Sequence, residues 1–149
     1  MIRVQEQDFD AGAEMAALRK GRTDAGAIAA FVGLVRDHAS GREVTSMTLE
    51  HYPGMTEKEL ARIEAEARER WQLLDCLIVH RIGRLSAGDN IVLVITLSEH
   101  RRAAFEAAQF LMDYLKTTAP FWKSEENGEV RHWVAPRDAD DAAAERWVR

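Results

Sequence analysis

The stretch FEAAQFLMDYLKTTAPFWK, from Phe105 to Lys123, decides how this chain folds and where its chemistry lies. Its first part predicts an apolar helix, which Pro120 stops because proline lacks an amide hydrogen and restricts the residue before it. Lys116 lies near the helix end and Lys123 follows the break. Lysine is rarely buried without a partner. Burial and mutual repulsion lower the pKa of a lysine in general, which suits an amine for proton transfer near neutral pH. Alternatively, both ammonium groups reach water along their aliphatic stems.

The composition describes a globular chain. The chain has 149 residues, of which 46% are hydrophobic and 30% are charged. This length and composition are sufficient for one domain with a hydrophobic core, and we predict a single domain over residues 1–149. A net charge of -5 gives no general electrostatic reason to bind nucleic acid, and no basic–aromatic ribbon supports an RNA-binding domain. No run approaches transmembrane length and the N-terminus lacks a signal-peptide core, so we expect a cytoplasmic protein without a membrane partner.

Cysteine and histidine are too sparse to predict a metal site or a disulfide. The single cysteine, Cys76, lies in the apolar run LLDCLIVH and is expected to be buried and inert. Without a histidine–cysteine cluster at ligand spacing we expect no metal. His51 and His80 are interpreted as strand residues whose rings are satisfied by hydrogen bonds, rather than as catalytic groups.

Hydrophobic periodicity predicts five strands, at 1–4, 27–35, 45–51, 74–80 and 91–97, and helices at 8–20, 56–71, 98–118 and 140–147. The continuous apolar run at 27–35 is expected to be buried on both faces. Thr56 with Glu59 predicts a capping box, and Ser98 is expected to cap the third helix. Leu60, Ile63, Ala67 and Trp71 are expected to form the buried stripe of the second helix, with Glu64–Arg68 and Glu66–Arg70 pairs on its wet side.

Asn127-Gly128 predicts a hairpin with a two-residue turn. This turn pairs Trp122 with Trp133 and Lys123 with His132, and it sets Lys123 on the face opposite the tryptophans. Mixed strand and helix order with an antiparallel hairpin indicates an α+β fold with a mixed sheet, packed helices and a C-terminal β-hairpin.

Cationic residues recur at the ends of the apolar elements. If the fold gathers them, they form a small anion pocket, and a helix start adds free amide groups at His100 and Arg101. The alternative is that each is a solvated surface charge. These residues are Arg36, His100, Arg101, Lys116, Lys123 and Arg137. No phosphate loop, dinucleotide fingerprint or serine elbow is present.

Four motifs resemble the large catalytic subunit of molybdopterin synthase, the MoaE family. They are GLVRDH at 33–38, LEHYPGMTEK at 49–58, HRIG at 80–83 and FEAAQFLMDYLKTTAPFWK at 105–123, in the order and spacing of that family. The resemblance implies an α/β-hammerhead fold. It also implies a sulfurtransferase of molybdenum cofactor biosynthesis that converts cyclic pyranopterin monophosphate (precursor Z) to molybdopterin by inserting two dithiolene sulfurs.

The resemblance also implies the partners. Sulfur arrives as a thiocarboxylate on the C-terminal glycine of a small ubiquitin-like subunit, and two large subunits form a homodimer within a heterotetramer. No cofactor or metal is implied for the sulfur chemistry. An extended glycine tail needs a narrow apolar channel, and we expect Phe31, Met112 and Phe121 to line one. The alternative is a non-catalytic module that binds a ubiquitin-like partner or a pterin.

Motif by motif, the resemblance implies Lys116 and Lys123 as catalytic residues, which also bind substrate. The other implied substrate-binding residues are Leu34, Val35, Arg36, His100, Arg101, Ser124, Glu125 and, after the hairpin, Arg137. Two positions depart from the family pattern: Leu34 stands where lysine is often found, and Ser124 where arginine can occur. Both departures leave the lysine pair intact but alter the expected substrate contacts.

Overall fold

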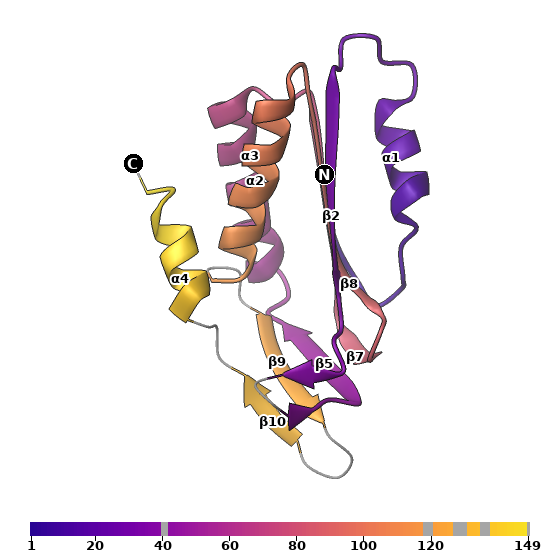
Figure 1. The fold of residues 1–149 in the computed structure, drawn as a ribbon, viewed down its shortest axis with the longest axis vertical. Helices are drawn as coiled ribbons and strands as arrows, with labels where there is room; N and C mark the ends of the chain where they lie inside the picture. The colour runs from indigo at the N-terminus through magenta and orange to yellow at the C-terminus, as the bar shows by residue number, and fades with distance from the viewer. Residues whose placement is uncertain (40–41, 118–120, 127–130, 135–137, 149) are drawn as a thin grey trace.

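Two four-stranded sheets and four helices make up the fold. The structure is a computed structural model that describes residues 1–39, 42–117, 121–126, 131–134 and 138–148. The first sheet has the order β1-β6-β8-β2, in which only β1 and β6 are parallel. Its strands are β1 (Ile2–Gln5), β6 (Asp75–Arg81), β8 (Asn90–Ser98) and β2 (Ala27–Leu34). Helix α1 (Ala11–Arg19) covers one face, and α2 (Met55–Trp71) and α3 (Arg101–Leu115) cover the other (Figure 1).

Strand β6 shows why this sheet needs helices on both faces. Alternate residues of a strand point to opposite faces. Cys76 and Ile78 belong to the core cluster that α2 and α3 complete, whereas Leu77 and Val79 belong to the cluster beneath α1. All four are at most 1% exposed. Both faces of the strand are therefore apolar, as its continuous hydrophobic sequence predicts.

The second sheet lies across one end of the molecule, below the first sheet in Figure 1. Its order is β10-β9-β5-β7 and all its pairs are antiparallel. The strands are β10 (Arg131–Val134), β9 (Phe121–Glu126), β5 (Ser46–His51) and β7 (Gly83–Ser86), and a short ladder joins β3 (His38–Ala39) to β4 (Arg42–Glu43). Helix α4 (Asp138–Glu145) lies beside α3. This arrangement confirms the α+β class.

Helix α2 has the predicted buried stripe but a different start. Leu60, Ile63 and Ala67 are fully buried, and the two predicted ion pairs on its wet side form. The predicted capping box is wrong, because the helix begins at Met55 after Gly54, whose φ is 86°. Glu57 instead accepts the Gly54 amide at 2.5 Å, and the Thr56 hydroxyl accepts the amide of Tyr52 at 2.9 Å.

Strand β2 is not buried on both faces, contrary to the expectation for its apolar run. It is the edge strand of the first sheet and pairs only with β8. Phe31, Val32 and Leu34 are 42%, 36% and 54% exposed. An apolar run reports burial only on average, whereas the place of a strand in the sheet decides which of its side chains are covered.

The hairpin of β9 and β10 forms with a register two residues away from the predicted one. Glu126 pairs with Arg131, and Lys123 pairs with Val134 rather than with His132. Trp122 therefore does not face Trp133, which pairs with Ser124. The predicted two-residue turn at Asn127-Gly128 lies outside the described residues. A shift of two keeps Lys123 and Trp122 on opposite faces of β9.

Candidate active site

The C-terminal end of α3 carries the first predicted catalytic residue. Lys116 is the C-cap of the helix, and its amide donates to the Met112 carbonyl at 3.2 Å. The side chain is exposed, which agrees with the alternative that the Lys116 ammonium group reaches water rather than being buried. Pro120, expected to end the helix, lies outside the described residues, and α3 already ends at Leu115. A helix C-terminus carries a partial negative charge, which favours an ammonium group there.

Lys123 approaches the same end of α3 from the second sheet. It is half-buried on β9, between Leu49 of β5 and Val134 of β10. Phe121, two residues earlier and therefore on the same face of the strand, packs against the core cluster that contains Met112 and Leu115. The side of β9 that carries Lys123 is therefore the side that packs, through Phe121, against the core cluster to which α3 contributes.

A buried histidine lies where these elements meet. His80, at the end of β6, is 8% exposed, and its ring stacks on Phe121 with centroids 3.8 Å apart and an interplanar angle of 17°. Its Nδ1 lies 2.8 Å from the Arg81 carbonyl oxygen. The pKa of His80 is lowered to about 4, chiefly by burial; the charges of His51 and Lys116 act in the same direction, and the hydrogen bond to the Arg81 carbonyl acts against them. The sequence interpretation of His80 as a hydrogen-bonded strand residue is confirmed, but its contact with Phe121 was not predicted.

The segment after β2 reaches this end of the molecule as well. Val35 is 3% exposed and packs with Met47 and Leu49 of the second sheet. Its amide donates to the Asp89 carbonyl at 2.9 Å. Because Val35 is anchored on both sides of its backbone, Leu34 and Arg36 project from a fixed position, and both are exposed. The pairing of β2 with β8 shifts register between Gly33 and Leu34, as in a β-bulge, which re-aims the side chains that follow.

Ser124 and Glu125 lie on β9 directly after Lys123. Ser124 is fully buried opposite Thr48, and Glu125 is 4% exposed opposite Met47. Glu125 shares the face of Lys123, since the two are separated by one residue. A carboxylate so close to a lysine on one strand face balances part of the local positive charge.

His100 and Arg101 are not with the other predicted site residues. They begin α3, whose 15 residues span about 22 Å at 1.5 Å per residue, and Lys116 lies at its opposite end. His100 is the N-cap, and the Ser98 hydroxyl, which was expected to cap the helix, instead accepts the His100 amide at 3.1 Å and donates to its carbonyl at 2.9 Å. Within one chain, these two residues therefore form a separate cationic group. Arg137 lies outside the described residues.

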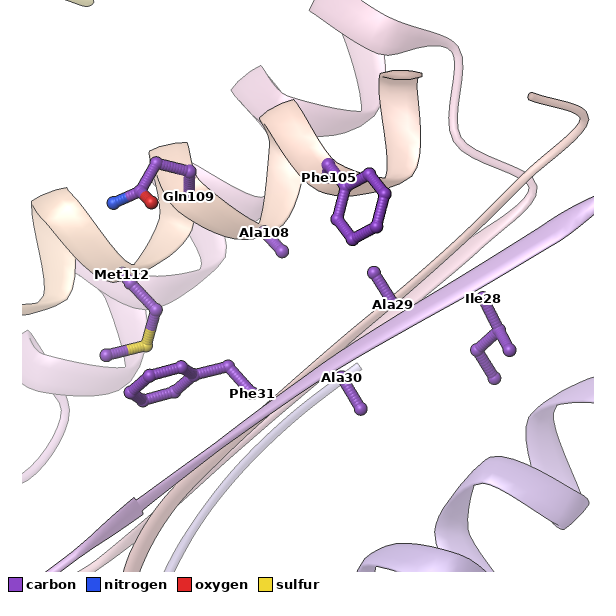
Figure 2. Close-up of a pocket in the computed structure, with 8 residues that line it drawn as sticks. All are labelled: Ile28, Ala29, Ala30, Phe31, Phe105, Ala108, Gln109 and Met112. Atoms are coloured by element: carbon purple, nitrogen blue, oxygen red, sulfur yellow. The ribbon is translucent and has the colours of Figure 1, made fainter. Parts of the chain in front are cut away.

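An apolar groove runs between β2 and α3, along the part of α3 from Phe105 to Met112. It encloses about 380 Å³ and is lined by Ile28, Ala29, Ala30, Phe31, Phe105, Ala108, Gln109 and Met112. Figure 2 shows the Phe31 ring against Met112 and the Phe105 ring over Ala29. Two of the three residues expected to line a channel, Phe31 and Met112, thus share this groove, and Phe121 does not line it.

The described residues hold no group of three or more His, Cys, Asp or Glu side chains placed to bind a metal ion. Nor does any helix in the described part of the chain have the length and apolarity to cross a membrane. Cys76 is fully buried, and burial raises the pKa of its thiol to about 12, which confirms that it is structural.

The fold is that of a small two-sheet α+β protein, and its candidate catalytic groups are Lys116 at the end of α3 and Lys123 on the second sheet. The family model described as MoaE protein matches residues 4–118, and the chain belongs to the MoaE family. The molybdopterin synthase catalytic subunit of Pseudomonas aeruginosa is 57% identical over 146 residues, which cover 98% of this chain and 97% of that protein.

Solved structures agree with this assignment. The MoaE protein of Burkholderia ambifaria is 54% identical with a TM-score of 0.84, and the match covers 99% of this chain and 97% of that one. A structure described as molybdopterin synthase from Staphylococcus aureus is 30% identical with a TM-score of 0.81, covering 89% and 96% of the two chains. The resemblance drawn from the four motifs is confirmed.

Proposed function

We propose that this chain is the catalytic subunit of a molybdopterin synthase, a sulfurtransferase of molybdenum cofactor biosynthesis that works in the cytoplasm. It transfers sulfur from the C-terminal thiocarboxylate of a small ubiquitin-like subunit to cyclic pyranopterin monophosphate, forming the dithiolene of molybdopterin. The observation that carries the proposal is the match of this chain to catalytic subunits over nearly its whole length, and it is supported by the places of the candidate lysines, Lys116 at the end of α3 and Lys123 on β9.

An external sulfur donor is consistent with the chemistry of this chain. Its one cysteine is fully buried with a thiol pKa raised to about 12 by burial, so the reactive thiolate form is not accessible near neutral pH. A thiocarboxylate brought by a partner supplies a sulfur nucleophile without using Cys76. The apolar groove between β2 and α3, with Phe31 and Met112 side by side, supports a path for an extended tail toward Lys116.

The lysines supply electrostatic and proton-transfer functions. As the partner's sulfur attacks a substrate carbon, Lys116 stabilises the developing negative charge or transfers a proton, and Lys123 orients the substrate and assists proton transfer. Arg36, at the same end of the first sheet, holds the cyclic phosphate by charge-assisted hydrogen bonds. Val35, Ser124 and Glu125 position these groups from buried backbone, and Leu34 lies at the rim.

His100 and Arg101 require a second copy of the chain if they bind the same substrate molecule as Lys116. The distance of about 22 Å along α3 is longer than the two extended side chains together. In a two-fold dimer whose α3 helices run antiparallel, the start of one α3 lies beside the end of the other. We therefore propose a composite site in which one protomer contributes Lys116 and Lys123, and its partner contributes His100 and Arg101.

Reconstitution tests the proposed function. The chain is incubated with cyclic pyranopterin monophosphate and a thiocarboxylated small subunit, and the dithiolene product is followed by mass spectrometry. Lys116→Ala is expected to lower turnover by about a hundredfold or more, as removal of one preorganised charge does in other enzymes. Binding of the partner and the pterin without product, with a partner active on another catalytic subunit, would instead establish the non-catalytic module.

A further inference from the structure

The stacked pair of His80 and Phe121 joins the two sheets at the lysine site. His80 ends β6 of the first sheet, and Phe121 begins β9 of the second. At a centroid distance of 3.8 Å and an angle of 17°, the rings are in direct face-to-face contact. The segment 118–120 between α3 and β9 lies outside the described residues, and at the start of β9 Phe121 makes this stack in addition to its pairing with His51 of β5.

The hydrogen bond of His80 determines both the orientation of its ring and its tautomer. The Arg81 carbonyl oxygen, 2.8 Å from Nδ1, can only accept a hydrogen bond, so Nδ1 carries the proton. The neutral ring then has its lone pair on Nε2. Arg81 is itself anchored, since its guanidinium donates to the carbonyls of Glu6 and Asn90. The imidazole is therefore held in one plane by its own strand.

The charges around His80 agree with a neutral ring. Lys116 of α3 and His51 of β5 both act to lower the pKa of His80, in the same direction as burial, which is the largest effect. His51 lies opposite Phe121 on the neighbouring strand and is paired with Glu57 at 3.2 Å. A neutral imidazole adds no further positive charge beside Lys116.

We propose that His80 is a positioning residue for the lysine pair. Its buried ring stacks on Phe121 and thereby fixes the position of β9, and so of Lys123, relative to Lys116. The link to Lys123 is short, because Phe121 and Lys123 are two residues apart on one face of the same strand. The link to Lys116 runs through the core cluster of α3, against which Phe121 packs. This inference rests on the proposed function for its kinetic consequence but not for its geometry.

Two variants of His80 separate the ring from the hydrogen bond. His80→Asn keeps a donor for the Arg81 carbonyl and removes the ring, whereas His80→Phe keeps the ring and removes the donor. Cys76→Ala is the matched control, since Cys76 is a fully buried residue at the other end of the same strand and takes no part in the stack of His80 on Phe121. Phe121→Leu removes the other half of the stack.

The kinetic test uses the complete synthase with thiocarboxylated partner. His80→Asn and Phe121→Leu are each expected to lower kcat by about tenfold to a hundredfold, the usual cost of displacing a reacting group by about 1 Å. The KM for the pterin should stay within about twofold, and the double variant should be no worse than either single one, because both remove the same contact. His80→Phe should recover most of the lost kcat. Cys76→Ala is expected to lose stability but to keep its kcat per folded molecule. The same result for His80→Asn and Phe121→Leu would overturn the proposal.

A second test needs no partner and no activity. A short amine-reactive cross-linker should join Lys116 to Lys123 in the wild-type chain, and mass spectrometry should show at least a severalfold lower yield in His80→Asn. Equal yields in the wild type, His80→Asn and Cys76→Ala would overturn the positioning role even if sulfur transfer is confirmed. A reduced yield in a chain that proves inactive with a competent partner would support the positioning role and reject only the proposed function.

Discussion

Mixing two inactive variants tests whether the site is shared between two copies of the chain. Lys116→Ala removes the amine at the end of α3, and Arg101→Ala removes the guanidinium at its start, about 22 Å away along the helix axis. Each variant alone should lose activity, by about a hundredfold for Lys116→Ala and about tenfold or more for Arg101→Ala, which loses a charge-assisted hydrogen bond.

The expected recovery follows from the symmetry of a two-fold dimer. After co-expression in equal amounts, half of the dimers contain one chain of each kind, and each of these has one intact site and one doubly altered site. Activity should therefore return to about one quarter of the wild-type value per chain in the unfractionated mixture, and to about one half in purified mixed dimers. The assay is dithiolene formation, with different affinity tags on the two chains to isolate the mixed dimers.

Lys116→Ala mixed with Lys123→Ala provides the matched control. Both lysines come from the same protomer in the proposed site, so no mixed dimer contains an intact site and no activity should return. Recovery in this control, or no recovery in purified mixed dimers of Lys116→Ala and Arg101→Ala, would refute the shared site and place His100 and Arg101 outside the pocket.

Three further predictions concern stability and reactivity. Burial lowers the pKa of His80 from 6.5 to about 4, so the unfolded state takes up a proton first as the pH falls. The free energy of unfolding should therefore drop by about 3 kcal/mol between pH 7 and pH 4. Urea titrations should show a smaller drop in His80→Asn, and an equal drop would contradict the assignment. Asp113→Ala should lower the free energy of unfolding by about 2–3 kcal/mol and release α4, since the buried Asp113 carboxylate accepts from Trp147 Nε1 at 2.6 Å and from Arg146 at 2.9 Å. Thermal unfolding measures the loss of stability and tryptophan fluorescence the release of α4. An unchanged melting temperature would contradict the prediction. Cys76 should resist iodoacetamide at pH 8 in the native protein and react in urea, as judged by mass spectrometry, because burial raises its thiol pKa to about 12.

Local sequence patterns correctly predicted the features that depend on residues within one element. The apolar stripe of α2 is buried and its charged face forms the expected ion pairs, since both depend only on helical periodicity. The exposure of β2 was not predictable in this way. Its apolar run is the same whether the strand is central or at an edge, and only the order β1-β6-β8-β2 leaves Phe31 and Leu34 uncovered.

The hairpin shows a similar limit. Asn127-Gly128 indicates a turn, but the register depends on how many residues join the strands. Pairing of β9 with β5 on its other side is part of what holds β9 in place, and this pairing joins segments about 75 residues apart. Short-range turn chemistry therefore predicted the hairpin, and the rest of the sheet decided which residues face each other.

For the site, the sequence by itself determined which residues are candidates, because Lys116, Lys123 and Arg36 stand in motifs that resemble one family, and His100 and Arg101 stand at the predicted start of the third helix. Only the tertiary structure decided how these residues are grouped. A straight helix of 15 residues keeps its two ends apart, so His100 and Arg101 are separated from Lys116 within one chain. Strand β9, which carries Lys123, meets the β6 strand of the other sheet in the stack of His80 on Phe121, a contact between residues 41 positions apart that no local pattern encodes.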